Sequence, residues 1–180
     1  ALGLDTEGTR SVAIGSDTLA AQNFTTTTSA NNTAVGYFVG NDITTGVSNT
    51  LMGATAGDAL TDADYNVALG ATSLTSDTLG SRSVAVGYAA LTMQNHTTAQ
   101  NTNNTAVGYA AGTDLTTGIQ NTLLGSLAGT DLTDADNNTA IGYGALDGDT
   151  SGSRSVATGY FALGNQNFTT ATNSNNTAVG

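Results

Sequence analysis

Aspartates recur at fixed positions along the chain, and they are the first groups whose spacing points to chemistry. The stretch "DLTDAD" at 131–136 carries three carboxylates, and "DALTDAD" at 58–64 repeats the pattern. Carboxylates stacked a few ångströms apart repel one another, and oxygen ligands of this kind suit Ca²⁺. The same residues also suit exposed turns, so both interpretations stay open. The candidate calcium ligands are Asp62, Asp64, Asp131, Asp134 and Asp136; no other cofactor is indicated.

A single histidine, His96, is the only candidate general base. It stands in "QNHTT" where two related stretches have "QNFTT", so it exchanges with Phe24 and Phe168. A residue that exchanges with phenylalanine is expected to be a loop-tip aromatic. There is no lysine for a phosphate-binding loop, and one histidine allows no repeated catalytic set. We therefore expect no enzymatic activity.

Polar loops offer a second kind of site. Three segments rich in Asn, Thr and Gln follow the phenylalanines and the histidine, and such loops on a rigid scaffold often bind ligands. A carbohydrate is one candidate ligand, and a solvated loop without a ligand is the alternative. The candidate ligand-binding residues are Asn23, Phe24, Asn95, His96, Asn167 and Phe168. The three arginines, Arg10, Arg82 and Arg154, share one repeat position, and we expect each to pair with a carboxylate of a neighbouring coil or chain.

The composition narrows the protein class. Charged residues make up 9% of the 180 residues, against about 25% in ordinary globular domains. The formal net charge of -11 disfavours nucleic acid and anionic membranes as partners, because both attract clustered Lys and Arg. No apolar run reaches the length of a membrane span, so this segment is not expected to insert into a bilayer.

The elements that position these residues are set by a repeat. Glycines that end motifs such as "SVAVG" and "NTAVG" recur with successive spacings of 21, 17, 17 and 17, which give a 72-residue superrepeat. A fixed period of this size indicates a solenoid. Residues 1–180 form one array, which we expect to be a segment of a longer fibre. The repeat units are 16–36, 37–53, 54–70, 71–87, 88–108, 109–125, 126–142, 143–159 and 160–180.

Each unit predicts β-structure. Within the motif, Val84 and Val86 flank Ala85, and this alternation is typical of a strand whose side chains point to opposite faces. A second, shorter strand is predicted at Ile43–Thr44 and its equivalents. Coils of this kind stack into an all-β, parallel β-roll, in which the motif Asn and Ser residues form a side-chain ladder that fixes the register.

The column of alanines is predicted to be the contact between chains, because one thin roll buries little apolar area. Leu51 and Leu123 interrupt the column once per superrepeat and would plug the axis between chains. The alternative is an alanine stripe that faces solvent. The predicted contact residues are Ala13, Ala34, Leu51, Ala68, Ala85, Ala106, Leu123, Ala140 and Ala157.

The stretches "SVAIG" (11–15), "SVAVGYAA" (83–90) and "NTAVGYAAG" (104–112) resemble the head repeats of trimeric autotransporter adhesins. The resemblance implies a left-handed parallel β-roll and a homotrimer around one axis, with no catalytic residues. The units here are longer than is common in that family, and long arrays of this kind are also similar to repeats of phage tail fibres and bacterial surface fibres.

Three functions are consistent with these patterns. The first is a structural shaft of an extracellular fibre, on a cell surface or a virion, and we favour it because no coil stands out as a site. The second is an adhesin head that binds a host surface or glycan through the loops of the 21-residue units. The third is an ice-binding solenoid, suggested by the threonine column at 44, 61, 78, 116, 133 and 150.

Overall fold

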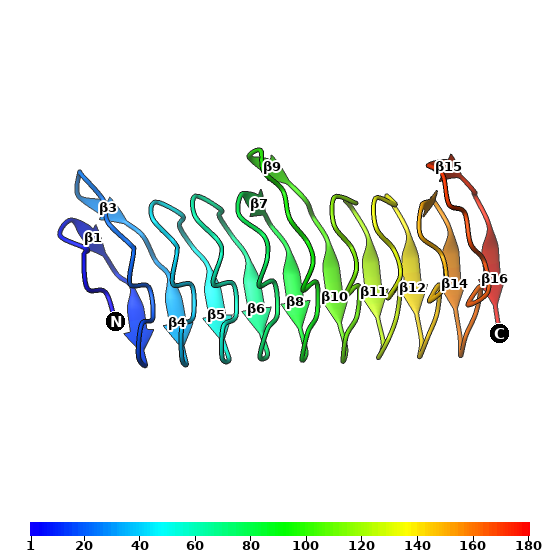
Figure 1. Ribbon diagram of the computed structural model, residues 1–180, viewed down its shortest axis with the longest axis horizontal. Coiled ribbons are helices and arrows are strands. Elements are labelled where there is room, and N and C mark those ends of the chain that lie inside the picture. Colours follow the sequence, from blue (N-terminus) through cyan, green and yellow to red (C-terminus); the bar gives the residue numbers. More distant parts are fainter.

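The computed structural model describes residues 1–180 as a rod of stacked coils with its two termini at opposite ends (Figure 1). The fold is an all-β parallel solenoid, as the repeat predicted. The chain contains no helix, and hence none that would be long and apolar enough to cross a membrane.

Each coil contributes one three-residue strand to a parallel ten-stranded sheet. The strands pair in register, so that Thr105 aligns with Val84 on one side and with Thr122 on the other. In sequence order they are β2 (Val12–Ile14), β4 (Thr33–Val35), β5 (Thr50–Met52), β6 (Val67–Leu69), β8 (Val84–Val86), β10 (Thr105–Val107), β11 (Thr122–Leu124), β12 (Thr139–Ile141), β14 (Val156–Thr158) and β16 (Thr177–Val179).

Each 21-residue unit carries a loop that projects from the rod (Figure 1). Three two-stranded parallel ribbons lie at the bases of these loops, and β3, β9 and β15 rise above the row of shorter coils (Figure 1). The ribbons pair β1 (Gly8–Thr9) with β3 (Thr28–Ser29), β7 (Gly80–Ser81) with β9 (Gln100–Asn101), and β13 (Gly152–Ser153) with β15 (Thr172–Asn173).

The second strand that we predicted at Ile43–Thr44 is absent, and this prediction was wrong. Successive coils do meet there, since the Thr44 amide donates to the Thr61 carbonyl at 2.9 Å. The chain then bends at once, at Gly46, where a side chain would lie 2.5 Å from the carbonyl oxygen of Ala63. The bend leaves no room for a run of strand geometry.

The interior of the roll is a narrow column of small and medium apolar side chains. In β8 the side chain of Ala85 is fully buried, whereas Val84 and Val86 remain partly exposed on the outer face. Ala85 belongs to a cluster of 25 buried residues that runs along the rod and includes Ile43 and Leu60. The predicted alternation of the strand is therefore confirmed.

This burial corrects the predicted role of the alanine column. Its members point into their own chain, where they are buried and cannot contact a second one. At most 1% of the side chain is exposed in Ala34, Leu51, Ala68, Ala85, Ala106, Leu123, Ala140 and Ala157, and Ala13 in the first coil packs on the same core.

The two larger residues of the column are accommodated by glycines. A methyl group on Gly112 would lie 2.7 Å from Leu123, and one on Gly129 would lie 2.8 Å from it. Gly40 and Gly57 stand in the same relation to Leu51. In coils 71–87 and 143–159, which do not lie beside Leu51 or Leu123, Leu74 and Leu146 occupy the glycine position, so large and small side chains exchange places along the core.

Candidate functional site: a buried carboxylate network under each projecting loop

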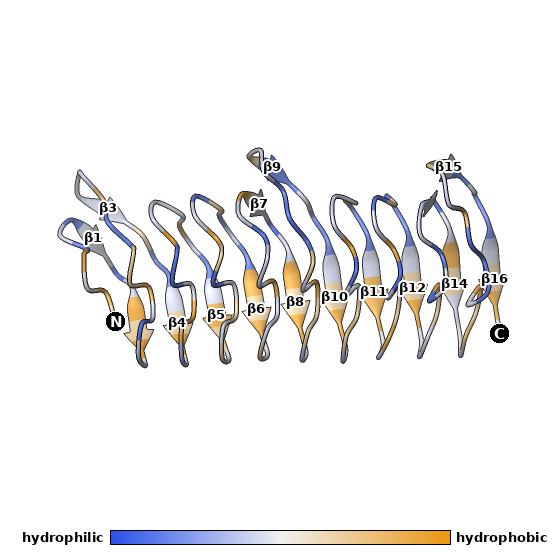
Figure 2. Cartoon of the chain, in the orientation of Figure 1, coloured by the Kyte–Doolittle hydropathy of each residue, from blue (hydrophilic) through white to orange (hydrophobic).

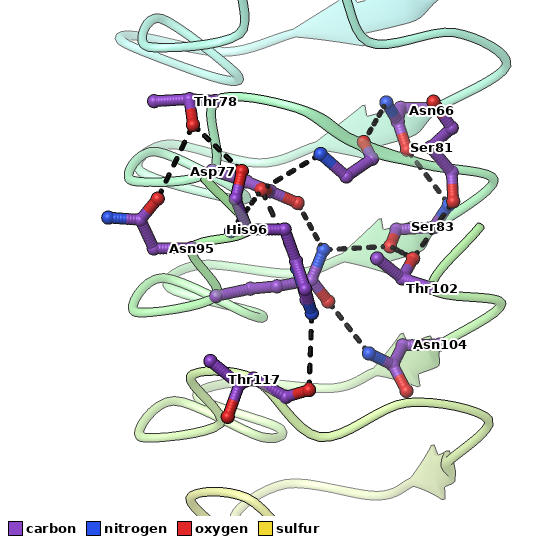
Figure 3. Close-up of polar contacts among 12 residues, drawn as sticks. Asn66, Asp77, Thr78, Ser81, Ser83, Asn95, His96, Thr102, Asn104 and Thr117 are labelled. Atoms are coloured by element: carbon purple, nitrogen blue, oxygen red, sulfur yellow. Dashed lines mark hydrogen bonds and ion pairs between the residues drawn. The ribbon is translucent and has the colours of Figure 1, made fainter. Parts of the chain in front are cut away.

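A polar network occurs three times, once per superrepeat, each time at the base of a projecting loop. In the central copy, Oδ1 of Asp77 accepts hydrogen bonds from the backbone amides of Gly80 at 3.1 Å and His96 at 2.9 Å. Its Oδ2 accepts one from Nε2 of Gln94 at 2.5 Å. Asp77 and Gln94 are both fully buried, so the network holds a charged carboxylate inside the roll (Figure 3).

Gln94 connects this carboxylate to the motif ladder. Its Nε2 also donates to Oγ of Ser83 at 2.9 Å, and its Oε1 accepts from Nδ2 of Asn104 at 2.9 Å (Figure 3). Ser83 ends one run of ladder residues, and Asn104 begins the next run in the following coil. The glutamine amide therefore bridges the ladder at the point where serine replaces asparagine.

The other two networks repeat the arrangement without a histidine. Asp149 accepts from the amides of Gly152 at 3.1 Å and Phe168 at 2.9 Å, and from Gln166 at 2.5 Å. Asp5 accepts in the same way from Gly8, Phe24 and Gln22.

Sequence reasoning missed these three aspartates, because it attended to the aspartates that recur in successive 17-residue units. The signal that would have found them is a glutamine that follows each of these aspartates at one constant spacing. Gln22 follows Asp5, Gln94 follows Asp77 and Gln166 follows Asp149, once per superrepeat.

His96 is buried rather than placed at a loop tip, which corrects the sequence-based expectation. Only 2% of the residue is exposed. Its Nδ1 lies 3.7 Å from Oδ1 of Asp77, and its Nε2 lies 3.2 Å from the carbonyl oxygen of Thr117 in the next coil. The ring fills the space that Phe24 and Phe168 occupy at the equivalent positions, and Phe24 is likewise buried.

The contact between His96 and Asp77 shifts the pKa of each residue so that its charged form is favoured. Burial by itself would lower the pKa of His96, but the contact with Asp77 and the Thr117 carbonyl raise it above its ordinary 6.5. Burial would raise the pKa of Asp77, but the contacts with His96 and Gln94 lower it below 3.8. When His96 is protonated, its contact with Asp77 is the only ion pair in the chain.

The six candidate ligand-binding residues do not form one surface. Asn23, Asn95 and Asn167 are exposed, whereas the aromatic residue that follows each asparagine turns toward the rod. Thr78 donates to Oδ1 of Asn95 at 3.5 Å, so that side chain also contacts the neighbouring coil. The exposed polar groups that remain lie farther out, around β3, β9 and β15.

The candidate calcium ligands are not brought together. No group of three or more His, Cys, Asp or Glu side chains is close enough to hold a metal ion. Oδ1 of Asp64 instead accepts from the amide of Val47 at 2.7 Å, and Oδ1 of Asp136 accepts from the amide of Ile119 at 2.8 Å. Asp62, Asp131 and Asp134 are exposed. The calcium prediction therefore finds no support, because these carboxylates cap backbone amides or face solvent separately.

Like charges do lie near one of these candidates, Asp131, and near a further aspartate, Asp58. Burial and the nearby carboxylates of Asp147 and Asp114 raise the pKa of Asp131. Burial and Asp42 raise the pKa of Asp58 in the same manner. These aspartates therefore repel one another without forming a site.

The arginines have no carboxylate partner within the chain. Arg10, Arg82 and Arg154 are exposed and take the same left-handed backbone conformation, with φ of 65°. The guanidinium of Arg82 lies 5.9 Å from the centre of the Tyr65 ring. Their predicted pairing is wrong within one chain, and pairing with a second chain stays a prediction.

Tyrosines and threonines line the outside of the coils. Tyr88 and Tyr109 stack with their ring centres 5.5 Å apart, and both are more than half exposed. Threonines of the column form hydrogen bonds to the next coil. Thr116 and Thr133 each donate their hydroxyl to a backbone carbonyl one coil away. Ice binding by this column stays a prediction, which a thermal hysteresis assay would test.

The molecular surface has no pocket. No protein-family model, no curated protein and no solved structure matches this sequence.

Proposed function

We propose that the chain is a shaft segment of an extracellular fibre, carried on a cell surface or a virion, and that its role is length and stiffness. One observation carries this proposal: a continuous, in-register set of main-chain and side-chain hydrogen bonds joins every coil to the next. A rod cross-linked at each layer resists bending along its whole length. The absence of any pocket and the near identity of the coils favour a mechanical role over a single localised site.

We further propose that the shaft is a homotrimer, with left-handed coils, as the resemblance to adhesin head repeats implies. The outer face of the ten-stranded sheet is the surface that suits this assembly. The two outward positions of every strand hold only Val, Ile, Leu, Met or Thr, in a chain with 14 acidic residues. Figure 2 shows the hydrophobic residues concentrated along this row of strands.

The charge distribution supports contact through this sheet face. Identical chains with a net charge of -11 repel one another wherever their carboxylates meet. The outward strand positions carry no carboxylate, so sister chains can approach there while their acidic bends stay in solvent. Exposed members of the face include Ile14 at 60% and Met52 at 51%, and apolar patches of this kind mark protein–protein contacts.

Sedimentation of the intact chain and of two matched variants tests the assembly. Val86→Asp combined with Val107→Asp places charges on the sheet face and should dissociate or unfold the trimer. Thr98→Asp places a charge in the projecting loop, where the side chain is exposed, and should leave the trimer intact. A wild-type chain that sediments as a folded monomer would overturn the proposed trimer.

The second candidate function is adhesion through the projecting loops. It is favoured by β9 and β15, which consist of polar residues and stand out from the rod (Figure 2). The test shortens each 21-residue unit to the length of the other units and compares binding to cells and to a glycan array. Loss of binding by a variant that keeps its oligomeric state would favour the adhesin, and absence of binding by the intact chain would favour the shaft.

A further inference from the structure

The ring of His96 faces a hydrogen-bond acceptor at each of its two nitrogens. Nε2 lies 3.2 Å from the Thr117 carbonyl oxygen, which only accepts, so Nε2 must carry a proton. Nδ1 points to the Asp77 carboxylate at 3.7 Å and has no other partner. A neutral ring would therefore turn a bare lone pair toward a buried carboxylate, whereas an imidazolium donates from Nε2 to the Thr117 carbonyl and directs its Nδ1 proton and positive charge toward that carboxylate.

We infer that His96 is a pH-sensitive latch that holds the base of the central projecting loop, residues 95–103, against the rod while the ring is protonated. Its backbone is a junction of three contacts. The amide donates to Asp77 at 2.9 Å, and the carbonyl accepts from the Thr78 hydroxyl at 2.9 Å (Figure 3). The carbonyl also accepts from the Leu79 amide at 3.0 Å. Loss of the proton removes the attraction between the ring and the Asp77 carboxylate at this junction, and the base of the loop loosens.

The groups packed against the ring define the direction of the switch. The preceding coil supplies the carboxylate of Asp77, the following coil supplies the Thr117 carbonyl, and no other titratable group affects the His96 ring. Because the pKa of His96 is raised in the folded chain, the latch contributes fully below about pH 6.5 and is lost as the pH rises through the raised value. The pKa of Asp77 is lowered, so its contribution is lost only as the pH falls below 3.8.

The chain contains its own controls. The loops at 23–31 and 167–175 are built on the same aspartate and glutamine network, but Phe24 and Phe168 occupy the latch position. They carry no group that titrates between pH 5 and 8 at this position. Only the central loop should therefore respond to pH, which a general effect of pH on the rod would not produce.

Amide hydrogen exchange of the intact chain, read by mass spectrometry from about pH 5 to about pH 9, tests the latch. After correction for intrinsic exchange, protection of residues 95–103 should fall about tenfold for each pH unit that the His96 pKa is raised, while the two phenylalanine loops stay constant. The His96→Phe variant repeats a natural feature of the other loops, and its central loop should become independent of pH. Equal behaviour of all three loops, or pH dependence that survives in His96→Phe, would overturn the inference.

Nitrogen NMR of the His96 ring provides a second readout. Both ring nitrogens should be protonated at about pH 6 and one should lose its proton at higher pH, with the proton retained on Nε2. A neutral ring at about pH 6 would equally overturn the latch, whether or not the loops differ in exchange.

Discussion

Oδ1 of Asn104 accepts a hydrogen bond from the backbone amide of Asn121, one coil further along, at 2.9 Å. The Nδ2 of the same Asn104 donates to the carbonyl of Gly118 at 2.8 Å. One buried side chain thus satisfies an amide and a carbonyl of the next coil at the same time. The relationship is repeated by Asn32, Asn49, Asn66 and Asn121. The predicted ladder is therefore confirmed for the asparagines, as a connection from side chain to backbone, whereas the hydroxyls of Ser83 and Ser155 accept from Gln94 and Gln166.

The Asn121→Ala substitution should strongly destabilise the fold. It removes the partner of the Asn138 amide and of the Ala135 carbonyl, both inside the roll. A buried polar group without a partner costs about 1–3 kcal/mol, so the free energy of unfolding should fall by about that amount for each group. Chemical denaturation measures the loss. Asn165→Ala is the control, because Asn165 is exposed, and equal losses in both variants would contradict the role of the ladder.

The motif glycines should not tolerate a side chain. A methyl group on Gly125 would lie 2.3 Å from the carbonyl oxygen of Gly142, and the backbone there has φ of +142°. Gly125→Ala must therefore push two coils apart, at a cost beyond the about 1–3 kcal/mol of backbone strain alone. Thermal unfolding should show a large drop for this variant, whereas Gly3→Ala, with nothing within 4 Å of the added methyl group, should match the wild type.

The hydrogen bond between Asp149 and Gln166 should tolerate an exchange of its donor and its acceptor between the two residues. In Asp149→Asn the new amide faces Nε2 of Gln166, and two donors then meet where a 2.5 Å hydrogen bond stood. The loss should be about 1–3 kcal/mol in the free energy of unfolding. Gln166→Glu alone places two carboxylates together and should also destabilise. The double variant restores one donor and one acceptor, so a double-mutant cycle should recover most of the loss; additive losses would exclude a direct interaction.

The sequence predicted those features that repeat locally. The alternation of Val84, Ala85 and Val86 set the strand, and the regular spacing of the motif set the in-register ladder. It did not predict that Ala85 faces inward. Hydrophobicity alone favours burial of the larger valines, and only the width of the closed coil, a property of the tertiary fold, selects the methyl group.

The network around His96 was missed for a related reason. Exchange with Phe24 and Phe168 indicated an aromatic site but did not indicate which side of the chain it would face. The charge on His96 depends on Asp77, which belongs to the preceding coil and becomes adjacent only when the coils stack. Spacings within one unit do not reveal contacts that join a shorter unit to a longer one.

The alternation of large and small side chains in the core can be tested by moving a leucine from one position to its neighbours. Leu123→Ala should lower the free energy of unfolding by about 2–5 kcal/mol, as buried leucines do, because Leu123 fills the space beside Gly112 and Gly129 inside one chain. Adding Gly112→Leu and Gly129→Leu should recover much of this loss, since Leu74 and Leu146 already adopt the same left-handed backbone at equivalent positions. Denaturation followed at several protein concentrations distinguishes this role from a plug between chains. A core residue changes the stability of the folded chain without changing its dependence on concentration, whereas a selective loss of association with unchanged chain stability would contradict the buried assignment of Leu123.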